Sequence, residues 1–418
     1  MKRYSDTKMS INRRKFLQTA RWAALAPFAP GLFTGLGGGG RSGALKAGLL
    51  IPSSEIYPDM GKNFLAGMEA YRKISRSDVL SRIEFIVKDT GVGQARVLKA
   101  AQNLIESENV RLITGIIDPS LNPDLVDLCA EKQVLLMANN AGANLYTDHA
   151  GNPWVFQNSM QYCQSNHAMG LWAARNLGRR AVVAASFFES GYDAMYAFGR
   201  GFEEGGGKIL KTVISKKPDP ADDSRLPVQT IRDLKPDVVF AAYSGTDAVE
   251  FVRLFSGAGL SATTTLVTSG FMTDDHVLNQ LGPESTGIIS CHSWVPGLVN
   301  DANASMTDQF RTGYGRTPDA FAVMGFETAI LIGVMSGPGR FPASINSQPI
   351  TGPRGHIKYN PQMAGTETAI YVREVKQVNG KPQNSVIAEL NYISAGPDPS
   401  LLAASGPRTG WLNAYLCV

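Results

Sequence analysis

Short apolar runs alternate with longer amphipathic stretches along most of the chain, beginning near residue 45. Runs such as 47–51 and 134–137 are wholly apolar and predict buried strands. The intervening segments 61–73 and 94–106 carry apolar side chains at helical spacing. Apolar strands that alternate with amphipathic helices are typical of parallel sheets covered by helices on both faces.

This pattern runs through the chain and restarts after the apolar residues 154–156. The expected strands are 47–51, 83–87, 112–117, 134–137, 181–185, 209–213, 238–242, 265–268 and 287–290. The expected helices are 61–73, 94–106, 123–132, 165–177, 192–204, 227–234, 248–258, 302–314 and 320–335. Alternating residues later in the chain predict a β meander, formed by 355–359, 368–375 and 386–389. Residues 395–418 are rich in Gly, Pro and Ser and receive no assignment.

Two doubly wound units in tandem predict an α/β protein with two lobes and a ligand cleft between them. In open α/β sheets, ligands bind beyond the carboxyl ends of the strands. The loops after the strands are therefore the candidate ligand-binding segments. These loops are 52–60, 118–122, 138–144, 187–192, 243–247 and 269–274.

The N-terminal segment has the pattern of a twin-arginine export signal. Arg13 and Arg14 precede a modest apolar stretch over 20–36. The alternatives are a basic amphipathic helix and a membrane span, but Arg21 and several Pro and Gly residues interrupt the roughly 20 apolar residues that a span needs. We therefore assign 1–43 to a signal and linker, with a periplasmic location. The signal is either cleaved or retained as an anchor.

Without the N-terminal segment, the net charge of the chain changes from positive to negative. Residues 1–25 hold seven basic residues and one acidic residue, a net charge of +6, whereas the whole chain is +4, so the remainder is −2. The basicity therefore belongs to the signal and does not indicate a nucleic-acid surface. The remaining length favours two domains.

The cysteine pattern indicates neither a metal site nor a redox motif. Cys129, Cys163, Cys291 and Cys417 are far apart in the sequence, and no C-x-x-C occurs. Cys129 and Cys291 lie in apolar surroundings and are expected to be buried thiols. An exported protein can form disulfides, and the sequence leaves any pairing open.

Several stretches, in order and spacing, carry a resemblance to a known family. They are 46–52, 61–70, 85–90, 95–104, 115–120, 134–138, 313–322 (GYGRTPDAFA), 325–329 (GFETA), 351–355 (TGPRG) and 371–375 (YVREV). The chain resembles the substrate-binding proteins of branched-chain amino acid-type ABC transporters, which have the type I periplasmic-binding fold. The resemblance covers residues 45–390.

The resemblance implies a hinged clamp that closes on a small solute and presents it to an inner-membrane ABC permease. The two lobes would be joined by three crossing segments. Lobe one would comprise 45–157 and 291–345, and lobe two 160–288 and 348–392. The protein would act as a monomer without cofactor or metal. Members of the family bind amino acids, amides, urea or small carboxylates.

The resemblance and the loop positions together nominate a set of ligand-binding residues. They are Tyr57, Ser120, Asn140, Ala141, Gly142, Tyr192, Tyr243, Ser244, Gly270 and Phe271. Ser120 precedes a helix start and suits a carboxylate, and its alternative is an ordinary helix cap. Residues 140–142 would supply backbone and amide contacts, with a left-handed turn as the alternative. The tyrosines would form cleft walls, unless they pack in the core with satisfied hydroxyls.

One departure from the family narrows the ligand class. Amino-acid-binding members place an acidic residue where this chain has Gly270, and that residue pairs with the ligand ammonium. A buried ammonium without a carboxylate partner is costly. Asp247 and Asp274 are nearby substitutes, but both are placed as helix caps. We therefore expect an apolar or aromatic carboxylate, or a neutral solute, with Phe271 as an apolar wall.

The sequence shows no catalytic constellation. The five histidines are scattered, and neither a P-loop, a G-x-S-x-G elbow nor a dinucleotide fingerprint occurs. His292, beside Cys291 near a lobe crossing, is interpreted as structural, with a ligand contact as the alternative. Besides an importer component, two functions stay open. They are a ligand sensor of the same fold that regulates a partner, and an exported enzyme.

Overall fold

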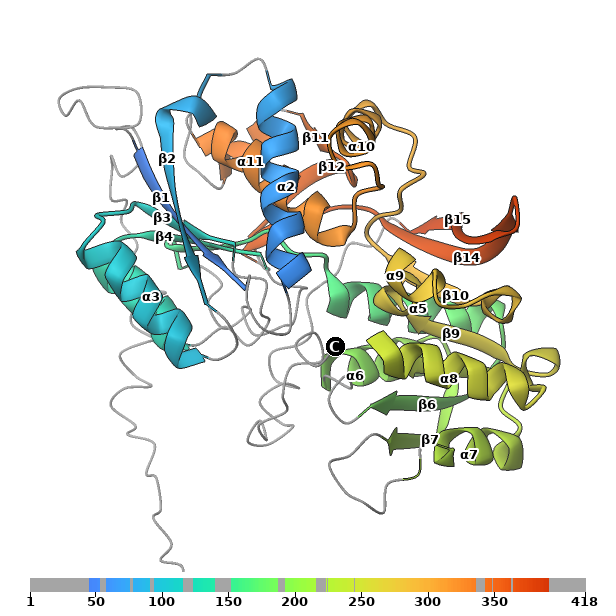
Figure 1. Cartoon of the computed structure of the whole chain (residues 1–418). Coiled ribbons are helices and arrows are strands. Elements are labelled where there is room, and N and C mark those ends of the chain that lie inside the picture. The colour runs from blue at the N-terminus through green and yellow to red at the C-terminus, as the bar shows by residue number, and fades with distance from the viewer. Residues whose placement is uncertain are drawn as a thin grey trace, which may run out of the picture.

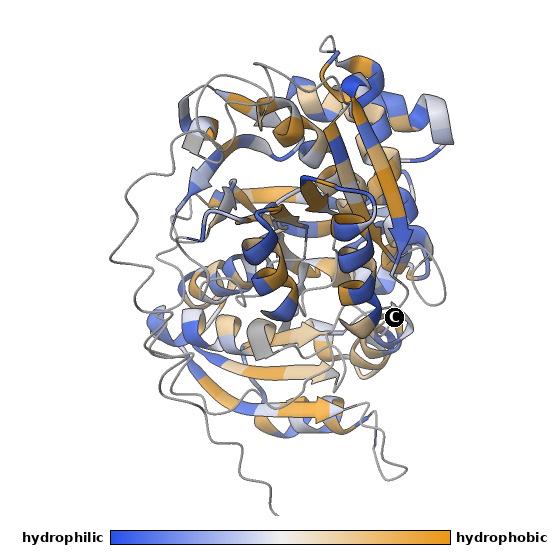
Figure 2. Cartoon of the chain, turned by 90° about the vertical axis from the view of Figure 1, so that its left-hand side faces the viewer, coloured by the Kyte–Doolittle hydropathy of each residue, from blue (hydrophilic) through white to orange (hydrophobic). Residues whose placement is uncertain are grey.

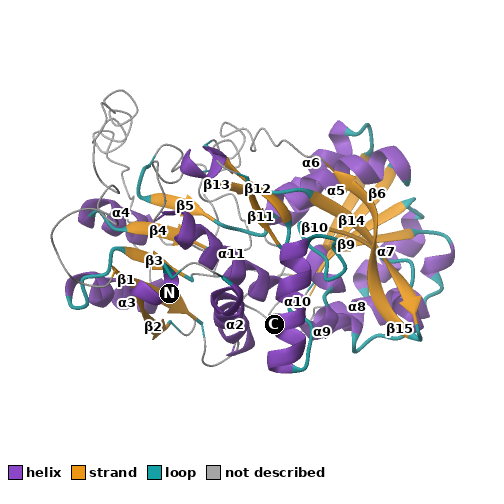
Figure 3. Ribbon diagram, turned by 90° about the horizontal axis from the view of Figure 1, so that it is seen from above, coloured by secondary structure: helices purple, strands orange, loops and turns teal. Residues whose placement is uncertain are grey.

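Two α/β lobes lie side by side, each built on its own sheet (Figure 3). The computed structural model describes residues 45–52, 58–75, 78–90, 94–115, 123–139, 152–186, 192–215, 223, 225–243, 245–335, 343–347, 349–361 and 364–390. The expected class, two doubly wound sheets joined by three crossing segments, is confirmed. Figure 1 shows how the helices surround the two sheets.

The sheet of lobe one has the strand order β11-β12-β13-β5-β4-β3-β1-β2. Its strands are β1 (Leu45–Ile51), β2 (Ile83–Asp89), β3 (Leu112–Thr114), β4 (Leu135–Ala138), β5 (Val155–Gln157), β11 (Ile350–Gly352), β12 (Gly355–Asn360) and β13 (Gly365–Glu367). The helices of this lobe are α2 (Pro58–Ile74), α3 (Gln94–Glu106), α4 (Pro123–Lys132), α10 (Asp301–Tyr314) and α11 (Ala320–Met335), with short 3-10 turns at η2 (Leu80–Arg82) and η7 (Ala343–Ser347). Strands β1 to β5 pair in parallel, and β11 and β12 add antiparallel pairs.

The sheet of lobe two has the order β15-β14-β10-β9-β8-β6-β7. Its strands are β6 (Arg180–Ser186), β7 (Lys208–Ser215), β8 (Val238–Ala242), β9 (Thr265–Ser269), β10 (Ile289–His292), β14 (Ile370–Val378) and β15 (Lys381–Leu390). The helices are α5 (Tyr162–Asn176), α6 (Tyr192–Glu204), α7 (Leu226–Leu234), α8 (Gly245–Gly257) and α9 (Asp275–Leu278), with η4 (Leu260–Ala262), η5 (Gly270–Thr273) and η6 (Pro283–Ser285). Strands β6 to β10 are parallel, whereas β14 and β15 are antiparallel.

One part of the expected domain assignment is corrected by the strand pairing. Residues 348–392 were assigned to lobe two from the family resemblance, but β11, β12 and β13 pair within the sheet of lobe one. Only β14 and β15 join lobe two, as an antiparallel hairpin. The pairing partner of a strand depends on distant residues, which alternation along the strand does not reveal.

Successive side chains of a strand point to opposite faces of its sheet, and each face packs against its own apolar layer. In β1, Leu49 packs with α2 and α11, whereas Leu50 faces the layer of α3 and α4. In lobe two, Val183 faces the layer of α5 and α6, whereas Val182 faces the layer of α7 and α8. The strands are accordingly mostly hydrophobic, and the helices carry both kinds of residue (Figure 2).

The chain crosses between the lobes at three described places. The first crossing, 158–161, joins β5 to α5, the second, 293–300, joins β10 to α10, and the third, 368–369, joins β13 to β14. Hydrogen bonds connect these segments directly. Ser293 Oγ donates to the Met160 carbonyl oxygen at 3.1 Å, and Thr368 Oγ1 donates to Gln161 Oε1 at 2.7 Å.

The buried Arg354 side chain lies where the three crossings meet. It is in the turn between β11 and β12 and is 0% exposed. Its Nη1 donates to the Ser159 carbonyl oxygen at 2.5 Å and to Ser293 Oγ at 3.5 Å. The Arg354 carbonyl oxygen accepts a bond of 3.1 Å from the Tyr371 hydroxyl, just beyond the third crossing. Arg354 thus bonds to the first and second crossings and to Tyr371 in β14, just after the third.

Glu327 on α11 neutralises this buried cation. Arg354 Nη2 and Nε donate to Glu327 Oε2 at 2.6 and 2.9 Å, and both side chains are 0% exposed. Breaking a buried ion pair by removing one partner leaves an uncompensated charge, which costs about 3–5 kcal/mol. The pair is therefore a point at which a single substitution weakens the junction of the lobes.

We predict that Glu327→Leu lowers the free energy of unfolding by about 3–5 kcal/mol, because it leaves the buried Arg354 charge without a counter-ion. The double variant Glu327→Leu/Arg354→Met should recover part of this loss, since no unpaired charge remains. Urea unfolding followed by circular dichroism measures both values. A single variant as stable as the wild type would contradict the assigned role of the pair.

Candidate functional site

Most of the residues nominated from the sequence lie outside the described part of the chain. These are Tyr57, Ser120, Asn140, Ala141, Gly142 and Ser244. Tyr192 is the first residue of α6, and its side chain is also outside the description. Their roles remain predictions. The described candidates are Tyr243, Gly270 and Phe271, to which the structure adds neighbouring residues.

Asn139, directly after β4, is fully occupied by protein contacts. Its Oδ1 accepts hydrogen bonds from Thr114 Oγ1 at 2.6 Å and from the Gly115 amide at 3.2 Å. Its Nδ2 donates to the Asn158 carbonyl oxygen at 3.1 Å and to Thr328 Oγ1 at 2.8 Å. The amide fastens the end of β4 to the first crossing and to α11, so this side chain has no capacity left for a solute.

Tyr243 matches the core-packing alternative. It follows β8, is 2% exposed, and belongs to the apolar layer beneath α7 and α8. Its ring stacks on Phe251 with centroids 4.7 Å apart, and its hydroxyl lies 3.0 Å from Ser215 Oγ. A buried tyrosine whose hydroxyl has a partner is an ordinary core residue. We therefore leave Tyr243 out of the proposed site.

Phe271 lies at the junction of the two lobes, at the carboxyl end of β9. Its ring centroid is 5.8 Å from that of Tyr162, the first residue of α5 after the first crossing. It also stacks at 6.3 Å on Phe321, which lies in the first turn of α11 in lobe one. Phe271 thus belongs to an aromatic set that spans both lobes, and its role as an apolar wall for a ligand stays a prediction. Neither Tyr162 nor Phe321 was nominated from the sequence, although Phe321 lies in the GYGRTPDAFA stretch.

Gly270 has no room for a side chain. A Cβ at this position would lie 2.3 Å from His292 Cδ2 and 2.7 Å from the Cys291 carbonyl oxygen. The Gly270 carbonyl oxygen accepts a hydrogen bond of 2.6 Å from Arg373 Nη2. The imidazole at the end of β10 therefore fills the space that an acidic side chain at 270 would need. An acid cannot be accommodated here without displacing His292.

Two buried groups set the electrostatics of this region. Arg373 on β14 is 1% exposed and donates to Ser290 Oγ, the Trp294 carbonyl oxygen and Thr273 Oγ1 at 3.1, 3.2 and 2.9 Å. Burial lowers the pKa of this guanidinium, and the charge of Asp274 opposes that shift. Burial, with the charges of Arg373 and Arg354, lowers the pKa of His292 well below its usual value. His292 is therefore neutral.

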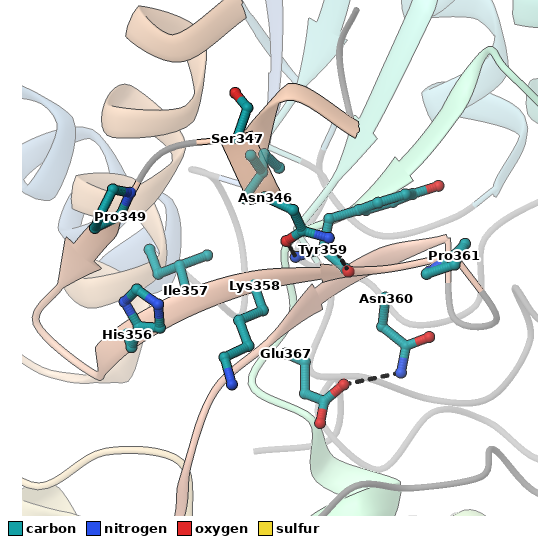
Figure 4. Close-up of a pocket in the computed structure, with 11 residues that line it drawn as sticks. Asn346, Ser347, Pro349, His356, Ile357, Lys358, Tyr359, Asn360, Pro361 and Glu367 are labelled. Atoms are coloured by element: carbon teal, nitrogen blue, oxygen red, sulfur yellow. Dashed lines mark hydrogen bonds between the residues drawn. The ribbon is translucent and has the colours of Figure 1, made fainter.

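A separate open cavity of about 460 Å³ lies on lobe one (Figure 4). All of its lining residues fall within 345–367, and none is a nominated ligand residue. Two of its polar side chains bond to other lining residues. Asn346 Nδ2 donates to the Tyr359 carbonyl oxygen at 3.0 Å, and Asn360 Nδ2 donates to Glu367 Oε2 at 2.8 Å. This cavity is therefore distinct from the junction between the lobes.

The described cysteines are buried free thiols, as the sequence suggested for Cys129 and Cys291. Burial raises the pKa of each of these two thiols to about 12, which makes them poor nucleophiles. Within the described ranges, no group of three His, Cys, Asp or Glu side chains could hold a metal ion. No helix in that part of the chain is long and apolar enough to cross a membrane.

Comparisons with known proteins agree with this architecture. A curated relative, Leu/Ile/Val-binding protein homolog 6 of Brucella melitensis, is 24% identical over 377 residues, which covers 86% of this chain and 94% of the relative. An ABC transporter solute-binding protein of Rhodopseudomonas palustris, solved with 3,4-dihydroxybenzoic acid, has a TM-score of 0.70 at 24% identity and covers 85% of this chain and 99% of its own.

A second R. palustris solute-binding protein, solved with benzoate, has a TM-score of 0.67 at 26% identity, with coverage of 82% and 96% of the two chains. The family model described as periplasmic binding protein matches residues 44–382 of this chain. That match spans both lobes and all three crossings. The chain therefore belongs to the periplasmic binding protein family.

Proposed function

We propose that the protein is the exported solute-binding component of an ABC importer, and that it captures an apolar or aromatic carboxylate between its lobes. Membership in the family implies a periplasmic location and the binding of a small molecule. The R. palustris neighbours were solved with benzoate and with 3,4-dihydroxybenzoic acid, which supports an aromatic carboxylate. Binding, closure of the hinge and release make up the activity, and no bond of the solute is broken.

The observation that carries this proposal is the ring set around Phe271. It lies at the carboxyl end of a parallel strand, where ligands of open α/β sheets bind. It also joins the lobes, because Phe321 belongs to lobe one and Phe271 to lobe two. Aromatic rings offer large apolar contact areas and favour stacked or edge-on ring partners. A benzoate-like ring suits such a wall.

The proposal also covers the export route of the protein and the transfer of its solute to a permease. The Arg13–Arg14 pair supports the twin-arginine route, and the closed form would dock on an inner-membrane permease. The alternative is a sensor of the same fold that regulates a partner protein. Solute uptake by cells with and without the gene separates the two, because a sensor does not carry the transported solute.

We predict that calorimetric titration detects binding of benzoate or a hydroxybenzoate, and weaker binding of leucine, isoleucine and valine. Phe271→Ala should weaken binding of the aromatic acid by about tenfold or more, because ring contacts are lost. Tyr314→Ala, which removes a 42% exposed ring on α10, is the matched control and should bind normally. Tight leucine binding without any response to aromatic acids would refute the proposed ligand class.

A second candidate ligand class, an α-amino acid, is favoured by one observation at Asp274. This residue is at the N-cap position of α9, as expected, but its side chain makes no capping hydrogen bond. It is half-buried, and burial raises its pKa to about 7, against the attraction of Arg373 and together with repulsion from Asp275 and Asp319. An ionised Asp274 could pair with an ammonium group, although Arg373 lies beside it.

The raised pKa of Asp274 gives a prediction for stability against pH. The unfolded carboxyl titrates near 3.8 and the folded one near 7, so the folded state binds the proton more tightly. Its contribution to stability is therefore complete below about pH 4 and is lost as the pH rises through about 7. Asp274→Asn should melt at a higher temperature than the wild type at about pH 8, with the difference vanishing toward about pH 4. Equal melting temperatures at both pH values would contradict this assignment.

A further inference from the structure

The imidazole of His292 has a hydrogen-bond donor that the protein leaves unused. His292 is the last residue of β10 and is 3% exposed. Its neighbour across the parallel pair is the end of β9, because Cys291 is in register with Ser269. His292 and Gly270 thus occupy adjacent carboxyl ends of two parallel strands, which is the edge where solutes bind in such sheets.

The contacts of the ring identify which nitrogen carries the proton. The Trp294 amide donates to His292 Nδ1 at 3.2 Å, so Nδ1 acts as an acceptor. Burial and the charges of Arg373 and Arg354 keep the imidazole neutral, as its lowered pKa indicates. A neutral imidazole has one protonated nitrogen, and the proton is therefore on Nε2.

Nε2 has no hydrogen-bond partner in the described structure, although it is buried. Buried donors without acceptors are rare, and each costs about 1–3 kcal/mol. The adjacent ring atom, Cδ2, lies against Gly270, and the ring meets Phe271 edge-on with centroids 5.2 Å apart. The unpaired Nε2–H of His292 therefore lies next to Phe271, in the group of rings that joins the lobes.

We propose that His292 Nε2 donates a hydrogen bond to an oxygen atom of the bound solute. This inference rests on the proposed function and specifies its site. An ammonium group cannot accept from an N–H donor, and Arg373 and Arg354 repel it as well. The subsite therefore selects a solute that presents an acceptor oxygen next to Phe271 and rejects one that presents an amine there.

Two oxygens of an aromatic acid could fill this subsite, the carboxylate oxygen or that of a ring hydroxyl. The wild type, His292→Phe and His292→Gln are titrated with benzoate and with 3- and 4-hydroxybenzoate by calorimetry. If the carboxylate is bound, His292→Phe weakens benzoate and the hydroxybenzoates alike, by about tenfold or more. If a ring hydroxyl is bound, the variant weakens a hydroxybenzoate and leaves benzoate unchanged. Gln places an amide donor near Nε2 and should restore part of the loss in either case.

Controls separate solute binding from folding. Ser344→Ala removes another buried hydroxyl without a partner, in η7 of lobe one, and should leave every affinity unchanged. The solute-free melting temperature of each variant is measured as well, because His292→Phe removes the unsatisfied donor but also takes the Nδ1 acceptor away from the Trp294 amide. The unmodified protein gives an independent measurement, since the Nε2–H resonance of His292 should move downfield when the solute is added.

The results separate a failure of the His292 subsite from a failure of the proposed function. Wild-type affinities that persist in His292→Phe, with an Nε2–H resonance that does not move, overturn the subsite and leave the proposed function standing. A wild-type protein that binds none of the aromatic acids overturns both. Should His292→Phe fail to fold, the resonance of the wild type decides the matter alone.

Discussion

The buried pair of Arg354 and Glu327 is the constraint on which the arrangement of the two lobes depends. A guanidinium without solvent must have a counter-ion and acceptors, and Glu327 with the crossing segments supplies them. Arg354 also bonds to Ser293 in the second crossing and to Tyr371, just after the third. In the proposed function, the lobes would close by small backbone rotations within the crossings, around this packed junction.

The candidate site lies at the same junction of the two lobes. One apolar layer runs through both lobes, from Phe64 and Phe326 to Phe198 and Phe240, and it includes Phe271. Some buried polar groups there are satisfied by protein contacts, as Asn139 and Arg373 show. The Nε2 of His292 is not, and neither are the hydroxyls of Ser165 and Thr268. Exceptions of this kind are expected at binding sites, where a ligand completes the bonding.

Much of the fold could be predicted from residue patterns, and much of the site could not. The helices 94–106, 123–132, 192–204 and 320–335 were predicted with their observed bounds, because their apolar periodicity is local. The strands 350–367 were assigned to the wrong lobe, since the choice of a partner strand is not local. Tyr243 and His292 look alike in sequence, each polar and just after or at the end of a strand. Only their three-dimensional contacts show that one is satisfied and the other is not.

Small-angle X-ray scattering, with and without a saturating aromatic carboxylate, measures whether the two lobes move when a solute binds. The central claim is that two lobes turn about the Arg354 junction and close on one small solute. It predicts a smaller radius of gyration in the saturated protein, with the change lost when the solute is removed by dialysis. An identical scattering profile at full saturation, with binding verified calorimetrically in the same sample, would contradict it.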